Sequence, residues 1–508
     1  MNKNWLQYKK TISALLGVIA TMALPPHYQV WLLVLSLSGL MLMLANVVKT
    51  KQAFAIGYWF GFGFFAVGLS WVANALTLDI KSFWWLIPLA LAGSGAFFGF
   101  FVALPAIGSC FFKGIWAKII VFATLWGIGE WVRSFLFTGF PWNLLGSALA
   151  FDHRLIQSVS FFGTYGLSVL VVLIAMLPAA TIKTQKKNVL AVIICEIVLI
   201  SGIIGYGKYR TDIIDDNKNS DIKIRIVQPS IPQSLKWNFS ELEHNFADYI
   251  EMSQASGFEN TDVVIWGETA STFPLTLDRT HLYQALPAVP DDGYLIAGSI
   301  DYYPDDDDRW LPVNAGIVLR HGKGIIDSYA KSHLVPFGEY IPLRRYIPAK
   351  LRPITKVIAD FRAGNGVKTI HTDKLPPFGI LICYEIIFPH EVADKNDRPQ
   401  WLINLTNDGW YGKSSGPYQH LVTAQLRAAE EGLTVVRAAN SGISAVISRS
   451  GKILAKIPLH ERGNLDVLLP ENLEIVTPYS KYGNIIFAIL SAVLLMLAGS
   501  LSWLNKHY

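Results

Sequence analysis

Three separate segments of the sequence carry residues that suit covalent chemistry with a cysteine nucleophile. Glu268 follows an apolar run in "VVIWGETAS", Lys331 and Glu339 share "YAKSHLVPFGEYIP", and Cys383 ends an apolar run in "GILICYE". A cysteine nucleophile needs a base to take its proton and a cation or N–H groups to hold an oxyanion. A glutamate, a lysine and a cysteine supply these parts without a histidine, and the lysine is also expected to lower the pKa of the thiol.

Cys383 taken alone would be interpreted as a structural residue, because free cysteine is among the most buried residue types. The ordered set of Glu268, Lys331 and Glu339 favours a functional interpretation instead. The two other cysteines, Cys110 and Cys195, lie in long apolar stretches and keep the structural interpretation. Three cysteines, an odd and sparse set, do not indicate a disulfide framework.

The sequence predicts two kinds of segment around these residues: apolar helices that span a membrane and a water-exposed domain. The chain has 508 residues, of which 52% are hydrophobic and 16% charged, which is too apolar for an ordinary soluble protein. A membrane helix needs about 20 mostly apolar residues. Eight segments are predicted to span a membrane: 11–25, 28–47, 53–76, 82–112, 116–137, 156–182, 188–206 and 483–504. We therefore expect seven spans in 1–210, a water-exposed domain in 211–480, and the eighth span with a short tail in 481–508.

The distribution of lysine and arginine among the short loops predicts the orientation, because cytoplasmic loops carry the excess. With the N-terminus inside, the inner segments hold Lys3, Lys9, Lys10, Lys49, Lys51, Lys113, Lys118, Lys183, Lys186, Lys187 and Lys506. The short outer loops hold Lys81, Arg154 and Lys481. Both termini are therefore expected in the cytoplasm, and the domain at 211–480 on the other side of the membrane.

The segment 211–480 has the pattern of an α/β domain. Short runs with strand character alternate with turn residues, and a helical face is evident in 239–252 and expected again in 418–432. The strands are predicted at 222–227, 262–266, 294–300, 315–319, 379–383, 401–406, 434–439 and 444–448. "SRSGK" at 448–452 indicates a hairpin turn.

In these contexts the order Glu, Lys, Cys resembles the nitrilase superfamily. With the eight spans, nearly the full chain resembles the membrane-embedded apolipoprotein N-acyltransferase family. The most specific matches are "HLVPFGEYIP", "CYE", "NDGWYG" and, in the membrane part, "GFPWN" at 139–143. The resemblance implies an eight-span helical bundle joined to a nitrilase-like α-β-β-α sandwich.

The resemblance also implies a role for each site residue. Cys383 is the expected nucleophile, Glu268 the general base and Lys331 the oxyanion stabiliser, while Glu339 orients the lysine. The backbone N–H of Tyr384 is expected to join the oxyanion hole, and Glu385 to orient nearby loops. One departure is Gly267, which precedes Glu268 where the family often has proline.

The implied reaction transfers a fatty acyl chain from a membrane glycerophospholipid, through a thioester on cysteine, to the α-amino group of a diacylglyceryl apolipoprotein. The implied location is the bacterial inner membrane with a periplasmic catalytic domain. Neither a metal nor a diffusible cofactor is expected. The net charge of +5 is small for this length, and no basic run predicts nucleic-acid binding.

Two other functions fit parts of the sequence. In a membrane-anchored nitrilase-type amidase, water would take the acyl group from the thioester. The eight spans favour the acyltransferase over this amidase, because both substrates of the acyltransferase are lipids. A transporter or scaffold would use the outer domain only for binding, but the spans lack the paired charges and broken repeats of a carrier.

A basic, apolar segment follows Glu339. In "YIPLRRYIPAKLRPITKV" at 340–357, Arg344, Arg345 and Arg352 stand among leucine, isoleucine and tyrosine. A core could not bury so many cations, and this mixture suits a membrane interface. We expect this segment, hereafter the basic arm, to lie on the outer leaflet and help deliver the phospholipid. Trp237 in "SLKWN" is either a substrate-contacting aromatic residue or a packing residue.

Three further polar residues, Glu130, Arg133 and His333, could have either a structural or a functional role. Glu130 and Arg133 lie one helical turn apart near the end of a predicted span, where ionisable residues are costly. A functional role and an ordinary interfacial ion pair are both open for them. His333 lies two residues after Lys331 and is expected to be structural, because the nitrilase mechanism leaves it no role.

Overall fold

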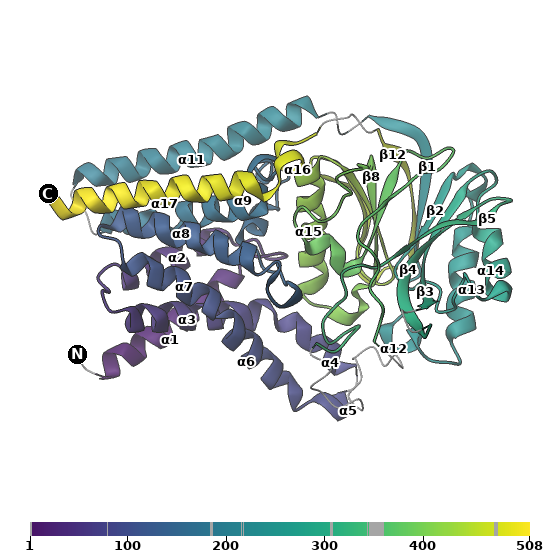
Figure 1. Ribbon diagram of the computed structural model, residues 1–508, viewed down its shortest axis with the longest axis horizontal. Helices are drawn as coiled ribbons and strands as arrows, with labels where there is room; N and C mark the ends of the chain where they lie inside the picture. Colours follow the sequence, from purple (N-terminus) through teal and green to yellow (C-terminus); the bar gives the residue numbers. More distant parts are fainter. Residues whose placement is uncertain are drawn as a thin grey trace. The chain divides into compact units, whose positions relative to one another are not determined.

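The chain folds into two compact units, which Figure 1 shows as ribbons of the computed structural model. The structure describes residues 3–78, 80–182, 186–214, 216, 218–304, 308–342, 344, 360–471 and 476–507. The first unit comprises Met1–Ile214, Tyr418–Glu431 and Val476–Tyr508. The second comprises Asp215–Pro417 and Gly432–Ile475.

The first unit is built from helices, most of them apolar. Its α-helices are α1 (Lys3–Thr21), α2 (Trp31–Leu44), α3 (Thr50–Gly68), α4 (Asn74–Thr77), α5 (Ile80–Phe83), α6 (Leu86–Phe98), α7 (Phe100–Cys110), α8 (Ile115–Val132), α9 (Val159–Met176), α10 (Pro178–Ile182), α11 (Lys186–Ile213), α15 (Gly416–Glu431), α16 (Pro478–Tyr482) and α17 (Asn484–His507). Short 3-10 turns are η1 (Ser70–Ala73), η2 (Leu136–Thr138) and η3 (Leu145–Leu149).

Several of these helices can cross a membrane. Within the described residues, five are long and apolar enough by length and composition, or up to six if α3 and the bent segment after it count as one span. The five are Leu86–Cys110, Ile115–Val132, Val159–Ile182, Val189–Ile213 and Asn484–Lys506. A shorter apolar helix, α2, lies where the second span is predicted. The expectation that the chain contains several apolar helices able to span a membrane is therefore confirmed.

Small residues let two of the helices pack closely. A Cβ atom on Gly17 of α1 would lie 2.0 Å from the carbonyl oxygen of Phe60 in α3. A Cβ atom on Gly63 of α3 would lie 2.1 Å from the carbonyl oxygen of Ala14 in α1. Only glycine fits at these two positions, and such backbone contact supplies the van der Waals packing that holds apolar helices together within a membrane.

The second unit contains two six-stranded sheets, in the orders β12-β1-β2-β3-β4-β5 and β11-β10-β9-β8-β7-β6. The strands of the first are β1 (Asn219–Gln228), β2 (Val263–Trp266), β3 (Tyr294–Pro304), β4 (Trp310–Arg320), β5 (Gly324–Ala330) and β12 (Gly463–Pro470). The strands of the second are β6 (Thr369–Ile370), β7 (Phe378–Ile382), β8 (Trp401–Thr406), β9 (Thr434–Ala439), β10 (Ser444–Ile447) and β11 (Ile453–Ile457). Parallel pairing joins β1, β2 and β3 in one sheet and β7, β8 and β9 in the other.

The two sheets share one apolar core, which includes Ile226 and Ile265 from the first and Ile380, Leu405 and Val436 from the second. A second core fills the space between the first sheet and the helices α13 (Leu242–Ser253) and α14 (Arg279–Ala285). Strands buried on both faces read as nearly continuous apolar runs, which is why the sequence shows them clearly.

The nitrilase-like fold with its two sheets is confirmed, and all eight predicted strands are present. The predicted helix at 239–252 is α13, and the turn at 448–452 closes with a hydrogen bond from the Ser448 N–H to the Lys452 carbonyl, 2.8 Å. The helix predicted at 418–432 is α15, which groups with the first unit although it connects β8 to β9. The sequence expectation had assigned it to the outer domain.

Candidate active site

Strand ends in the second unit bring the predicted residues together. β2 ends at Trp266, two residues before Glu268, and β5 ends one residue before Lys331. β7 belongs to the other sheet and ends at Ile382, so that Cys383 is the next residue. Rigid strands on both sides of one core therefore fix the positions of the three side chains.

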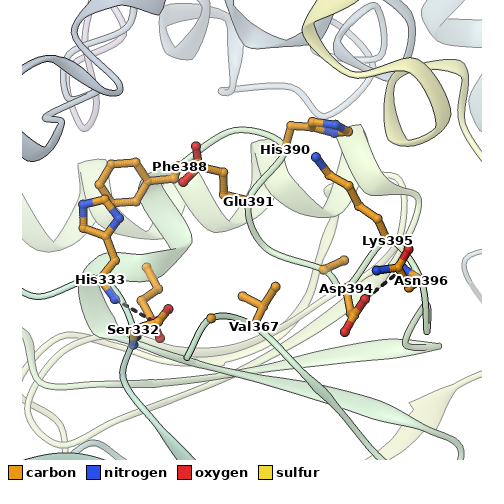
Figure 2. Close-up of a pocket in the computed structure, with 12 residues that line it drawn as sticks. Ser332, His333, Val367, Phe388, His390, Glu391, Asp394, Lys395 and Asn396 are labelled. Carbon is orange, nitrogen blue, oxygen red and sulfur yellow. Dashed lines mark hydrogen bonds between the residues drawn. The ribbon is translucent and has the colours of Figure 1, made fainter. Parts of the chain in front are cut away.

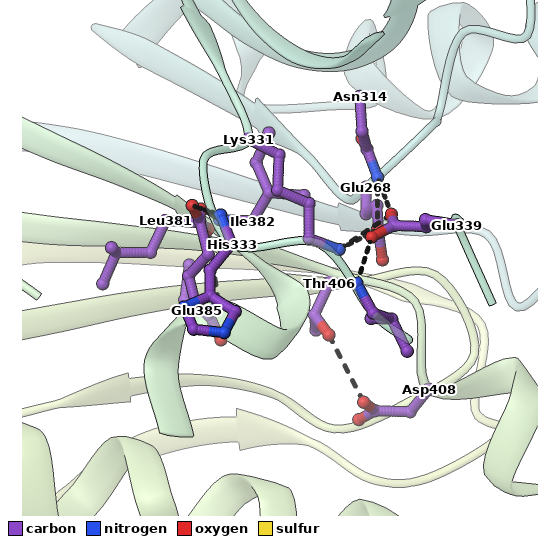
Figure 3. Close-up of polar contacts among 12 residues, drawn as sticks. Glu268, Asn314, Lys331, His333, Glu339, Leu381, Ile382, Glu385, Thr406 and Asp408 are labelled. Atoms are coloured by element: carbon purple, nitrogen blue, oxygen red, sulfur yellow. Dashed lines mark hydrogen bonds and ion pairs between the residues drawn. The ribbon is translucent and has the colours of Figure 1, made fainter. Parts of the chain in front are cut away.

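Two glutamates and an asparagine surround the amine of Lys331 (Figure 3). Lys331 Nζ lies 2.9 Å from Glu339 Oε1 and 3.6 Å from Glu268 Oε1. The Nδ2 amide of Asn314, on β4, donates to Glu268 Oε1 at 2.6 Å and to Glu339 Oε1 at 3.1 Å. The backbone N–H of Val335 donates to the other oxygen of Glu339 at 2.8 Å. Every member of this cluster is buried, so these contacts fix its geometry.

Charge in this cluster keeps Lys331 protonated. Burial alone would lower the pKa of Lys331, but the carboxylates of Glu339 and Glu268 outweigh burial and raise the pKa well above its usual value. A lysine that stays charged can stabilise an oxyanion throughout a reaction, and it cannot serve as a proton acceptor.

Cys383 has an unusual backbone conformation and a strongly perturbed thiol. It opens a 3-10 turn (Cys383–Ile387) with φ of 50°, a left-handed conformation rare for non-glycine residues and frequent at functional sites. Burial, together with the negative charge of Glu268, raises the pKa of the thiol to about 12, although Lys331 and a hydrogen bond with Thr406 lower it. The expectation that the lysine lowers the pKa of the thiol is confirmed, but burial and Glu268 outweigh its effect. At neutral pH the resting group is a thiol that needs a base.

Close backbone packing holds Glu268 at the site. Its N–H donates to the carbonyl of Thr406, at the end of β8, at 3.3 Å. A Cβ atom on Gly298 would lie only 2.2 Å from the carbonyl oxygen of Gly267. A Cβ atom on Gly267 itself would lie 3.1 Å from three backbone atoms, among them the carbonyl oxygen of Thr406. The glycine before Glu268 therefore lets this turn lie directly against both neighbouring strands.

Glu385 connects the turn that begins at Cys383 to the loop that follows Lys331. Its Oε1 accepts hydrogen bonds from the Tyr329 hydroxyl at 2.6 Å and from the Ser332 N–H at 2.8 Å. Its Oε2 accepts from the N–H of Ile382 at 2.7 Å. The carboxylate of Glu385 therefore links the turn at Cys383 to the segment that carries Lys331. The aromatic ring of Tyr384 is buried beside that of Phe388, with the two centroids 5.2 Å apart.

His333 packs against the segment that follows Cys383. Its ring stacks on Phe388 with the centroids 3.8 Å apart, and its backbone N–H donates to Glu385 at 3.2 Å. This geometry agrees with its structural interpretation.

A cavity of about 450 Å³, lined by both charged and apolar residues, opens beside this loop (Figure 2). The segments that follow Lys331 and Cys383 both line it, but the side chains of Glu268, Lys331 and Cys383 do not. The lining residues are Ser332, His333, Gly366, Val367, Glu385, Phe388, His390, Glu391, Ala393, Asp394, Lys395 and Asn396. Charges of both signs around it make this cavity unsuited to a fatty acyl chain, which requires apolar walls.

The sequence reasoning missed three groups beside the predicted site. The first is Asn314, a single amide in an otherwise apolar strand, which has no local signature in the sequence. The second is Lys236, the residue before Trp237. Asp408 and Arg437 form a fully buried ion pair, with Oδ2 and Nη2 2.7 Å apart. Among the described residues, no group of three or more histidine, cysteine or acidic side chains is arranged to hold a metal ion.

The residues predicted to bind substrate are described only in part. Trp237 is 39% exposed, so part of this residue reaches solvent. Arg344 is ion-paired with Asp360, its Nη2 lying 2.7 Å from Oδ1. Arg345 and Arg352, and most of the basic arm, lie outside the described residues.

In the first unit, Glu130 and Arg133 hold the "GFPWN" segment. Glu130 Oε1 accepts from the N–H of Leu145 at 2.9 Å, and Arg133 Nη1 donates to the carbonyl of Trp142 at 2.9 Å. Trp142 in turn donates through Nε1 to Gln419 Oε1 of α15 at 2.7 Å. Both ionisable residues are buried and make these structural hydrogen bonds.

Models of known protein families match both the helical part of the chain and its two-sheet part. A family model for carbon–nitrogen hydrolases matches residues 223–473, which places the second unit in this class. A model described as the apolipoprotein N-acyltransferase N-terminal domain matches residues 16–177. A solved amidase from Nesterenkonia sp. is similar at 17% identity with a TM-score of 0.37, covering 50% of this chain and 92% of that one, and we draw nothing further from this likeness.

Curated relatives match over nearly the whole chain. Apolipoprotein N-acyltransferases from Rickettsia typhi and Rickettsia prowazekii are 36% and 37% identical, each over 96% of this chain and 97% of their own length. The enzyme of the same name from Rhodopseudomonas palustris is 34% identical over 97% of this chain and 95% of its own. The chain therefore belongs to the apolipoprotein N-acyltransferase family.

Proposed function

We propose that this protein is an N-acyltransferase that moves a fatty acyl chain from a membrane glycerophospholipid to the α-amino group of a diacylglyceryl apolipoprotein. The observation that carries the proposal is the buried set of Glu268, Lys331 and Cys383 in a chain that belongs to this family over nearly its full length. Eight membrane spans, a periplasmic catalytic domain and a bacterial inner-membrane location belong to the same proposal. No cofactor takes part in it.

In the first half-reaction, Cys383 Sγ attacks the ester carbonyl of the phospholipid. The thiol proton passes to Glu268, because the raised pKa of Cys383 leaves little thiolate at neutral pH. The S–C bond forms, and Lys331 stabilises the oxyanion with its permanent charge, joined by the N–H of Tyr384. The ester C–O bond then breaks, and Glu268 returns the proton to the departing lysophospholipid oxygen.

In the second half-reaction, the neutral α-amine of the apolipoprotein attacks the thioester. The N–C bond forms and the C–S bond breaks, while Glu268 carries one amine proton to the sulfur of Cys383. Glu339 and Asn314 act through the other groups, because they hold Lys331 and Glu268 in position. This cycle needs only an ester and an amine, and both substrates of the proposed reaction supply them.

The test separates acyl transfer from hydrolysis. Purified protein in detergent micelles is exposed to phospholipid, and the mass of the Cys383 peptide is measured. A diacylglyceryl-cysteine peptide is then added. We expect an acyl adduct on Cys383 followed by amide formation on the peptide. Release of free fatty acid alone would support the amidase alternative, and the absence of an adduct would exclude a thioester enzyme.

The proposed orientation predicts the position of two reporters. A fusion after Lys187 should report the cytoplasm, and an insertion at 305–308 the outer side, because lysine and arginine concentrate in the proposed inner loops. Alkaline phosphatase and fluorescent-protein fusions at both sites give complementary signals. The opposite pair of signals would overturn the orientation.

The basic arm gives a further prediction. Replacing Arg344, Arg345 and Arg352 together by Gln should raise the phospholipid concentration needed for half-maximal acylation, while thioester still forms at saturating lipid. Each arginine near an anionic surface contributes about 1 kcal/mol of attraction. Acylation is measured against the phospholipid content of mixed micelles.

The matched control is Arg344→Gln alone, because Arg344 is already paired with Asp360. It should change lipid dependence less than the triple variant does. An unchanged lipid dependence in the triple variant, with a label at Leu351 remaining in water, would remove the arm from the proposal.

A further inference from the structure

A second buried lysine, Lys236, lies beside Glu268 and has no part in the reaction as described above. It is the last residue of α12 (Gln233–Lys236), and its side chain is 3% exposed. Its Nζ donates to the backbone carbonyl of Glu268 at 2.9 Å. Within the described part of the chain this carbonyl is the sole hydrogen-bond acceptor of the amine. A charged Lys236 has three N–H donors, so two of them have no acceptor among the described residues.

The segment that carries Lys236 is firmly held by the second sheet. Asn440, directly after β9, binds both backbone polar groups of Ile231 through its side chain, at 3.0 Å and 2.8 Å. Asn407, directly after β8, donates to Gln233 Oε1 at 2.9 Å. These two strand ends fix α12, so the amine of Lys236 is preorganised next to the backbone of the proposed base.

The electrostatic state of Lys236 is opposite to that of Lys331. Burial lowers the pKa of Lys236 to about 8, although the negative charge of Glu268 raises it. Lys331 has two carboxylate oxygens within 4 Å, whereas Lys236 has a neutral carbonyl. A buried ammonium without a carboxylate partner loses its hydration and gains little in return, so its neutral form becomes accessible.

The proposed function leaves one proton without an acceptor. The α-amino group of a protein is largely an ammonium at neutral pH, because its ordinary pKa is about 7.7–8.0. It must lose one proton before it attacks the thioester and a second while the amide forms. Glu268 carries the second proton to the sulfur of Cys383. Lys331 is permanently charged, so it cannot take the first.

We propose that Lys236 is the base that activates the acceptor amine, an inference that rests on the proposed function. Neutral Nζ takes a proton from the α-ammonium of the apolipoprotein, so that one N–H bond breaks and another forms. The freed amine then attacks the thioester on Cys383. The adjacent Trp237 reaches solvent, and Lys236 returns its proton to water after the amide is released.

The experiment starts from protein already acylated on Cys383, in wild-type form and as Lys236→Met and Lys236→Arg. Acylated protein is quantified by intact mass and then mixed at neutral pH with a diacylglyceryl-cysteine peptide or with hydroxylamine. Hydroxylamine is largely uncharged at this pH and needs no prior deprotonation. Rates are expressed per acylated molecule, so a loss of folded protein lowers the yield without lowering the rate.

Lys236→Met should slow transfer to the peptide by about 100-fold, a typical contribution of a positioned base, and should slow cleavage by hydroxylamine by less than about threefold. Lys236→Arg should be as slow as Lys236→Met with the peptide, because a guanidinium keeps the charge but does not accept a proton.

Recovery of peptide transfer in Lys236→Arg would show that charge alone matters and would overturn the inference. An equal loss with peptide and hydroxylamine would identify a structural role and would overturn it too, as would an unchanged rate with both. A wild-type protein that forms no thioester at all would remove the proposed function, and this inference with it.

Discussion

Cys383→Ala is expected to abolish both thioester formation and transfer to the lipopeptide while the protein remains folded. The substitution deletes the proposed nucleophile and leaves Glu268 and Lys331 paired, so the buried charges stay compensated. The space left is small, because a single sulfur atom is removed from a buried residue. The measurement is single-turnover acylation from phospholipid, with thermal unfolding as the test of fold.

The matched controls are Cys110→Ala and Cys195→Ala, which remove the other two thiols of the chain from helices α7 and α11. Both should acylate at nearly the wild-type rate. Normal acylation of a lipopeptide by Cys383→Ala would contradict the thioester mechanism. Loss of acylation in one of the control variants would indicate that another cysteine is the nucleophile.

Lys331→Ala is expected to have the second largest effect, on thioester formation. It removes an oxyanion donor, which costs about 3–4 kcal/mol in the transition state and slows acylation by about 10²–10³-fold. It also leaves the carboxylates of Glu268 and Glu339 adjacent in a buried site without their shared cation, which disfavours their ionised forms. Single-turnover acylation with phospholipid, measured across pH, reports both consequences.

Lys368→Ala is the matched control for the loss of a lysine in an ion pair. Lys368 Nζ lies 2.6 Å from Asp327 Oδ1, but its side chain is 42% exposed, so this pair contributes little. Lys368→Ala should acylate at about the wild-type rate and unfold within a few tenths of a kcal/mol of it. Wild-type single-turnover acylation by Lys331→Ala would remove its assigned role.

The glutamates illustrate how far residue order can predict a site. Glu339 was expected beside Lys331 because of the resemblance, and the two lie 2.9 Å apart. Asn314, which donates to both carboxylates, was not predicted, because a single amide in the strand "VNAGIVL" has no local signature. Its position depends on the pairing of β4 with β5, which is a contact between strands and not a property of either segment.

The lysines show the same limit for electrostatics. Lys331 and Lys236 carry the same group, yet the pKa of one is raised and that of the other is lowered. Local sequence does not reveal which buried amine faces carboxylates and which faces a carbonyl. Lys331 lowers the pKa of Cys383 as expected from its charge, but burial and Glu268, which local sequence does not reveal, raise that pKa by more.

The sequence by itself determined the apolar helices, the buried strands and the residue types at their ends. These features depend on runs of apolar residues and on near neighbours along the chain, which local patterns record. The tertiary structure alone decided which charged groups lie close together around Glu268, Lys331 and Cys383. It also decided that α15 groups with the first unit, although the residues before and after it in the sequence belong to the second. Those outcomes depend on desolvation and on distances between strands far apart in the chain, which are set only when the two sheets pack.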